Sequence, residues 1–100
     1  MDPANLLKID SLDNEWRDKD TVMLHACFQL LKDCVEQERL LDGNTDWQAD
    51  ERQRETYREL KALYDWWCGY ADNRFPDDAD YALETQMLER LVRIRWAMWT

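Results

Sequence analysis

Turn-forming residues are scarce in this chain, because its 100 residues include only two glycines and two prolines. These two residues most often end helices and form tight turns, so a chain with few of them has few elements. Between them, apolar side chains recur at spacings of three and four, the period of one helix face. We therefore expect an all-α fold: an antiparallel bundle of three long helices with an N-terminal strap or short helix. Because this length supplies a single core, residues 1–100 are expected to form one helical domain.

The first long helix is expected to begin near Asp18 or Asp20, where a carboxylate can cap free amides, and to end at Gly43. Its apolar stripe consists of Leu24, Cys27, Phe28, Leu31, Cys34, Val35 and Leu41. The preceding residues 1–19 have no clear period. We expect them to cross the bundle as a strap, anchored by Trp16.

The second helix is expected to begin at Thr45 or Asp46, because Thr45 and Gln48 have the spacing of a capping box. Its first half is nearly all charged and is expected to project into solvent, whereas its second half carries the apolar stripe. The third helix follows the loop around Pro76, is expected to be capped by Asp77 or Asp78, and is expected to reach about Trp99. An acidic start and a basic end suit its helix dipole.

The three stripes together predict the core. Residues that recur every third or fourth position on an amphipathic helix face the neighbouring helices. The residues expected to be buried are Leu24, Phe28, Leu31, Val35, Leu60, Leu63, Tyr64, Trp67, Leu88, Leu91 and Ile94.

The charge is strongly acidic: 22 acidic and 13 basic side chains give a net charge of −9. Such a surface repels phosphate backbones and anionic lipids, which argues against general nucleic-acid binding and against membrane binding. It favours a basic partner or an imitation of nucleic acid. Charged helix faces that are merely solvated explain the same composition.

Cysteine usage and hydropathy indicate a compartment. The three cysteines have no framework spacing, no N-terminal apolar run resembles a signal peptide, and no stretch approaches the about 20 apolar residues of a membrane span. We therefore expect a cytosolic chain with reduced thiols. Cys27 and Cys34 are expected to be small core residues and Cys68 to be exposed.

The sequence contains only weak motifs for metal binding or catalysis. His25 and the cysteines lack the paired short spacings of a structural zinc site, so His25 is expected to form a hydrogen bond at the edge of the bundle. Glu51 and Glu55 have a spacing that suits magnesium, but no second pair converges on them. We expect no catalytic residue, no metal and no cofactor.

One group of aromatic and basic residues is a candidate partner-binding patch. Tryptophan and arginine dominate binding hot spots, and these arginines form the only basic tract of an acidic chain. The patch consists of Trp66, Arg90, Arg93, Arg95, Trp96 and Trp99. The alternative interpretation is structural: the rings complete a broad core, and the arginines complement the end of the third helix and pair with the acidic second helix.

Three segments in order resemble a group of small bacteriophage-encoded proteins without an established activity. They are LHACFQLL with VE at 24–31 and 35–36, LYDWW at 63–67, and MLERLVRIRWAMWT at 87–100. The resemblance extends over most of the chain from Trp16 onward. It implies a phage origin and work in the cytoplasm of the infected bacterium. It brings no active site with it.

Several functions fit these observations. The main hypothesis is a small acidic interaction protein that acts stoichiometrically on a host factor or defence component. The alternative is a binding module that sequesters a small anionic, nucleotide-like ligand, and homo-oligomers are compatible with it. A magnesium-dependent hydrolase is the third hypothesis, and a minor virion component is the fourth.

Overall fold

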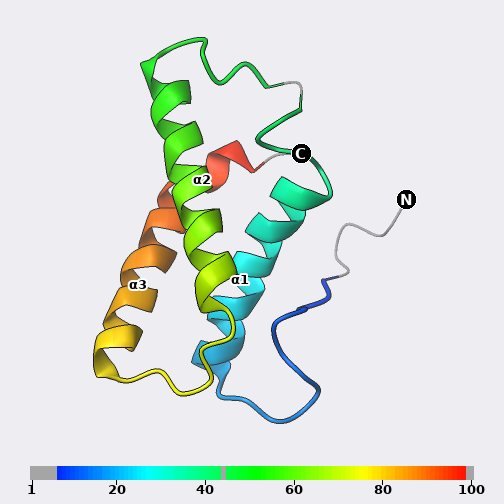
Figure 1. The fold of residues 1–100 in the computed structure, drawn as a ribbon, viewed down its shortest axis with the longest axis vertical. Helices are drawn as coiled ribbons and strands as arrows, with labels where there is room; N and C mark the ends of the chain where they lie inside the picture. Colours follow the sequence, from blue (N-terminus) through cyan, green and yellow to red (C-terminus); the bar gives the residue numbers. More distant parts are fainter. Residues whose placement is uncertain (1–6, 44, 99–100) are drawn as a thin grey trace.

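The computed structural model describes residues 7–43 and 45–98, and these contain three α-helices and no strand. The helices are α1 (Lys19–Glu36), α2 (Glu51–Tyr70) and α3 (Asp78–Arg93), and a short 3-10 helix, η1 (Arg95–Ala97), follows α3. Consecutive α-helices run in opposite directions, so α1 and α3 point the same way with α2 reversed (Figure 1). The predicted all-α bundle of three helices is confirmed. The helices contain 18, 20 and 16 residues, and each is shorter than its apolar pattern predicts.

The core contains side chains from all three α-helices. Leu40 and Trp47, which lie between α1 and α2, and Ala97 of η1 also belong to it. Most of the predicted core positions are confirmed, whereas Val35, Tyr64, Leu88 and Ile94 are half-buried and pack against the core from its edge. The buried apolar residues are Leu24, Phe28, Leu31, Leu40, Trp47, Leu60, Leu63, Trp67, Met87, Leu91 and Ala97.

The end of α1 differs from the prediction. The helix stops at Glu36, and the left-handed residue is Arg39, with φ 55°, rather than Gly43. The turn lets the N–H of Leu40 bond to the carbonyl of Cys34 at 2.9 Å and places the Leu40 side chain in the core. Gly43 is needed for a different reason, since a Cβ there would lie 2.7 Å from the Arg39 carbonyl oxygen.

The start of α2 also differs. The helix begins at Glu51, where the Asp50 side chain accepts a hydrogen bond from the N–H of Gln53 at 2.8 Å. The predicted capping box of Thr45 and Gln48 is therefore wrong. Residues 45–50 do not form the predicted first helical turn, and Trp47 among them is buried.

Trp47 is the residue that covers this end. Its side chain is 6% exposed, its Nε1–H donates to the carbonyl of Leu40 at 3.1 Å, and its ring lies 6.0 Å from that of Tyr57. Thr56 is buried as well. The first half of α2 therefore packs against the protein on one side, which corrects the expectation that it projects into solvent.

The start of α3 matches the predicted cap, but its end differs from the predicted end. Asp77 and Asp80 form a capping box at the start. The α-helix ends at Arg93, and the chain tightens into η1, which buries Ala97 at 1% exposure. The prediction of a helix to about Trp99 is therefore wrong, and Trp99 itself lies outside the described residues.

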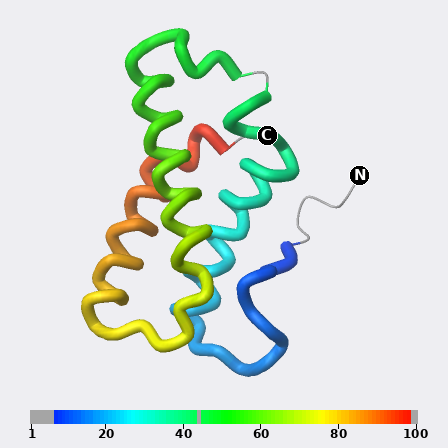
Figure 2. The backbone as a smooth tube through the Cα atoms, viewed as in Figure 1, coloured from blue at the N-terminus to red at the C-terminus, as the bar shows by residue number. Residues whose placement is uncertain are grey.

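The strap, residues 7–18, contains no helix and runs beside α1 (Figure 2). It is attached by polar bonds: the N–H of Asp10 donates to the side-chain oxygen of Gln29 at 3.0 Å, and Ser11 bonds to His25 at 2.6 Å. The predicted hydrogen bond of His25 at the bundle edge is confirmed. Trp16 is 78% exposed, so the prediction that it anchors the strap is wrong.

None of the helices in residues 7–43 and 45–98 is long and apolar enough to cross a membrane.

Candidate binding surfaces

The predicted patch of tryptophan and arginine residues does not form one surface. Trp66 packs inside the α1–α2 contact, stacked on Tyr70 at 4.6 Å and edge-on to Phe28 at 5.3 Å. Trp96 lies near the other end of α2, where the Arg52 guanidinium sits 3.9 Å above its ring. Arg52 and Trp66 are about four turns apart on α2, roughly 21 Å. The two tryptophans therefore belong to different ends of the bundle.

The arginines of the patch have different roles. Arg90 forms a two-pronged ion pair across the α2–α3 contact, with donor–acceptor distances of 2.8 and 2.5 Å to Glu59. This hydrogen bonding lowers the pKa of Glu59 and raises that of Arg90. The geometry favours the structural interpretation of Arg90. Arg93 and Arg95 are exposed, and neither makes an ion pair with the described part of the chain, whereas Trp99 lies outside it.

A second candidate surface consists of large apolar side chains of α1 and α3 that are exposed to solvent. The Tyr81 hydroxyl donates to Asp20 at 3.1 Å and so joins the starts of the two helices. Met23 and Leu30 follow on α1, two turns apart, and Val92 follows Tyr81 three turns later on α3. The four apolar side chains are 57%, 48%, 54% and 52% exposed for Met23, Leu30, Val92 and Tyr81. We call these four residues the apolar α1–α3 face.

Half-buried residues continue this face toward the core. Cys27 lies one turn from both neighbours on α1, and Leu88 lies one turn before Val92 on α3. Burial raises the pKa of the Cys27 thiol. Cys34 is also half-buried, so the prediction that both thiols are core residues was too strong. The spacing of four and three from residue 23 to residue 30 was the sequence signal for this face, because it makes the apolar part of α1 wider than one core needs.

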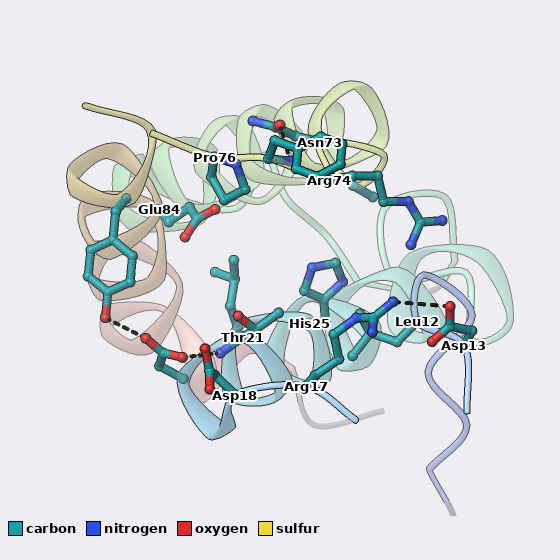
Figure 3. A pocket seen from close by; sticks show the side chains of 15 residues that line it. Leu12, Asp13, Arg17, Asp18, Thr21, His25, Asn73, Arg74, Pro76 and Glu84 are labelled. Atoms are coloured by element: carbon teal, nitrogen blue, oxygen red, sulfur yellow. Dashed lines mark hydrogen bonds and ion pairs between the residues drawn. The ribbon is translucent and has the colours of Figure 1, made fainter. Parts of the chain in front are cut away.

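A cleft of about 730 Å³ opens at the end of the bundle where three segments meet. Its walls come from the strap at residues 12–18, from the first two turns of α1, from the α2–α3 loop at residues 71–76, and from Tyr81 and Glu84 of α3. Figure 3 shows the side chains of these segments facing one another across the opening. This cleft was not predicted from the sequence, because its walls are far apart along the chain.

His25 forms part of the cleft wall. Its ring is 8% exposed, meets the Trp67 ring edge-on at 4.7 Å, and bonds through Nδ1 to Ser11. Burial lowers the pKa of His25, and the positive charges of Arg74 and Arg17 lower it further. The ring is therefore uncharged at neutral pH. Its second nitrogen, Nε2, forms no hydrogen bond with the residues that the structure describes.

Charges are segregated along the cleft. Arg17 and Arg74 lie at the His25 end (Figure 3). Arg17 is paired with Asp13 at 3.0 Å, whereas Arg74 makes no ion pair with residues 7–43 or 45–98. The other end is acidic, with Asp18 and the Glu84 side chain. The cleft thus presents two guanidinium groups at one end, where Asp13 pairs with Arg17, and carboxylates at the other.

The acidic residues considered for magnesium are used differently. Glu51 is paired with Arg54 at 2.9 Å and with Arg58 at 3.6 Å, and the hydrogen bond from Arg54 lowers its pKa. Within the described ranges, no group of three or more histidine, cysteine, aspartate or glutamate side chains is arranged to hold a metal ion.

Comparisons of the chain with protein-family models, with curated proteins and with solved structures find no match.

Proposed function

We propose that this protein is a non-catalytic interaction domain that binds a partner protein stoichiometrically through the apolar α1–α3 face. One observation carries the proposal: two large apolar side chains on α1 and two on α3 are each about half exposed, and the hydrogen bond from Tyr81 to Asp20 joins these two helices. Grouped apolar area of this kind gains free energy when another surface covers it.

The partner that fits is a basic amphipathic helix of another protein. Its apolar side chains would pack on Met23 and Leu30, as a helix packs in a groove between two others. Asp78 and Glu89 are exposed on α3, and each lies three residues before an apolar residue of the face, Tyr81 or Val92, so each is its neighbour on the helix surface. Their carboxylates and the net charge of −9 favour lysine and arginine on the partner and disfavour a second copy of this chain.

The setting of this interaction follows from the resemblance to phage-encoded proteins. We propose that the partner is a host factor or defence component in the cytoplasm of the infected bacterium. A rigid acidic bundle that occupies a basic surface blocks that surface without any chemical step, so one copy acts on one target.

The test is a single charge placed in the face. The variant Leu30→Glu adds a carboxylate at a half-exposed position, and Ala62→Glu adds the same charge at an exposed position on α2, outside the face. Each protein is immobilised, exposed to bacterial lysate and analysed by quantitative mass spectrometry. We expect the parent and Ala62→Glu to capture the same bacterial protein in an amount equimolar to the immobilised chain. Leu30→Glu should capture at least about tenfold less of it. Burying an unpaired carboxylate costs more than the about 1.4 kcal/mol that tenfold requires.

Two controls make the result decisive. Circular dichroism must be the same for all three proteins, since the positions are exposed. Equal capture by Leu30→Glu would refute the face as the binding surface. Light scattering that finds a parent dimer, which Leu30→Glu dissociates, would replace the partner protein with a second copy of the chain.

A further inference from the structure

We propose that the cleft beside His25 binds a small phosphate ester with a planar ring, of the mononucleotide class. The phosphate would lie between Arg17 and Arg74 with a hydrogen bond to His25, and the ring would lie against Phe75. This site is separate from the apolar α1–α3 face and does not depend on the proposed protein partner.

The size of the cleft fits this class of ligand. Sites for small molecules commonly enclose about 300–1,000 Å³, and this cleft measures about 730 Å³. Apolar side chains of Leu12 and Leu24 form part of the lining. The volume exceeds what a bare phosphate occupies, so the cleft has room for a larger group attached to the phosphate.

His25 supplies a positioned hydrogen-bonding group. The His25 ring is nearly buried, but its Nε2 is not a fully buried atom without a partner, so this nitrogen can exchange a hydrogen bond with water for one with a ligand in the cleft. Ser11 holds the other nitrogen at 2.6 Å and thereby fixes the ring orientation. When the Ser11 hydroxyl donates to Nδ1, Nε2 carries the proton and points a donor at the ligand.

Arg74 supplies the charge. It is exposed at the cleft edge and makes no ion pair with the described residues, although the protein is rich in carboxylates. A guanidinium presents a planar fork of donors that matches phosphate oxygens. Arg17 lies across the opening and adds a second cation. Its charge is partly offset by the ion pair with Asp13.

The rest of the cleft selects the remainder of the ligand. The Phe75 ring is 92% exposed beside Arg74, and Pro76 restricts the backbone of the residue before it, so the ring is offered for stacking at a limited range of positions. Asp18 and Glu84 at the opposite end repel a second anionic group and accept hydrogen bonds from hydroxyl or amino groups. A mononucleotide has the required phosphate, ring and donors.

Binding of the anion is expected to be coupled to a proton. The negative phosphate would offset the repulsion that Arg74 and Arg17 exert on a protonated ring, so the pKa of His25 should rise on binding. Affinity should therefore increase as the pH falls from 8 to 7, a range above the second pKa of about 6 of the phosphate ester itself. The charged groups that line the cleft together with the ring are Arg17 and Asp13 of the strap, Asp18 and Asp20 at the start of α1, Arg74 of the loop, and Glu84 of α3.

The single histidine makes the experiment direct, because one imidazole signal in the NMR spectrum reports on the site. The full chain is titrated with adenosine 5′-monophosphate, with adenosine and with inorganic phosphate. We expect the monophosphate to shift the His25 signal saturably and to raise its pKa. Adenosine and phosphate should each bind at least about tenfold more weakly, since each lacks one of the two contacts.

Matched variants separate the site from general charge effects. Arg74→Gln and Arg95→Gln each remove one exposed guanidinium, but only the first lies in the cleft. Arg74→Gln should weaken the monophosphate at least about fivefold, the loss of one charged hydrogen-bonding group, and Arg95→Gln should not. No saturable shift, or equal affinity for phosphate and the monophosphate, overturns the proposal. Leu30→Glu should bind the monophosphate normally, so failure of the protein-binding face and failure of this site are distinguishable.

Discussion

The two ends of the bundle differ in how their aromatic and polar groups are satisfied. At the end near Trp47 and Trp96, each ring has a partner inside the protein: the Leu40 carbonyl accepts from one indole, and Arg52 covers the other. At the other end, the strap and the α2–α3 loop surround His25 and Arg74 without filling the space between them.

This difference follows from which residues each end contains. A large ring removes much area from water and needs one polar contact, so two tryptophans close the first end with few residues. The second end brings together charged and hydrogen-bonding side chains, whose hydration would be lost if the space collapsed. One end therefore stabilises the fold, and the other remains open to solvent and to ligands.

The largest expected effect is at the closed end. Trp47→Ala should lower the free energy of unfolding by about 3–5 kcal/mol, because it removes a buried ring and leaves a cavity. Phe75→Ala at the open end removes an exposed ring and should change stability by less than about 0.5 kcal/mol. Urea denaturation of both variants tests the comparison. Similar losses for the two would mean that the ends do not differ in this way.

A smaller effect is expected at the open end when the pH changes. Because the folded pKa of His25 lies below the ordinary value of 6.5, the unfolded chain takes up a proton first as the pH falls. Stability from this group is complete above pH 6.5 and declines below it, by at most about 1.4 kcal/mol per pH unit. Thermal denaturation between pH 8 and pH 5 should show the decline, and His25→Gln should flatten it. An unchanged slope in the variant would assign the decline to other groups.

The smallest effect is expected at the contact between α2 and α3, in the middle of the bundle. A double-mutant cycle on Arg90 and Glu59 should give a coupling of about 0.5–1 kcal/mol, since the side chains are 41% and 28% exposed and solvent screens the pair. The lowered pKa of Glu59 means that this coupling persists to pH values below 4.5 and is lost as the carboxylate protonates. Arg90→Ala should leave partner capture intact. A loss of capture with an intact fold would restore Arg90 to a binding role.

The middle of each helix was predictable from local pattern, and the ends were not. Phe28, Leu60 and Leu91 lie on stripes that only a helix brings to one face, so their burial followed from spacing. The residues after Glu36 keep a helical pattern, yet the chain leaves the helix there. Burying Leu40 and Trp47 stabilises the protein more than a further helical turn would. The local sequence pattern does not show this difference in free energy.

The binding surfaces show the same division. The placement of Arg90 and Arg93 on the third helix was predicted correctly from the sequence. The ion pair of Arg90 with Glu59 depends on how α3 packs against α2. The cleft joins strap, helix and loop, so no stretch of sequence indicates it.

The sequence by itself determined that this chain is helical, with three amphipathic segments and a strongly acidic surface, because periodicity and charge are local or additive properties. The tertiary structure decided where the helices end, which arginines are paired, and which polar groups share a cleft. Those outcomes depend on contacts between residues far apart in the chain, such as the 2.6 Å bond from Ser11 to His25 and the bridge from Tyr81 to Asp20.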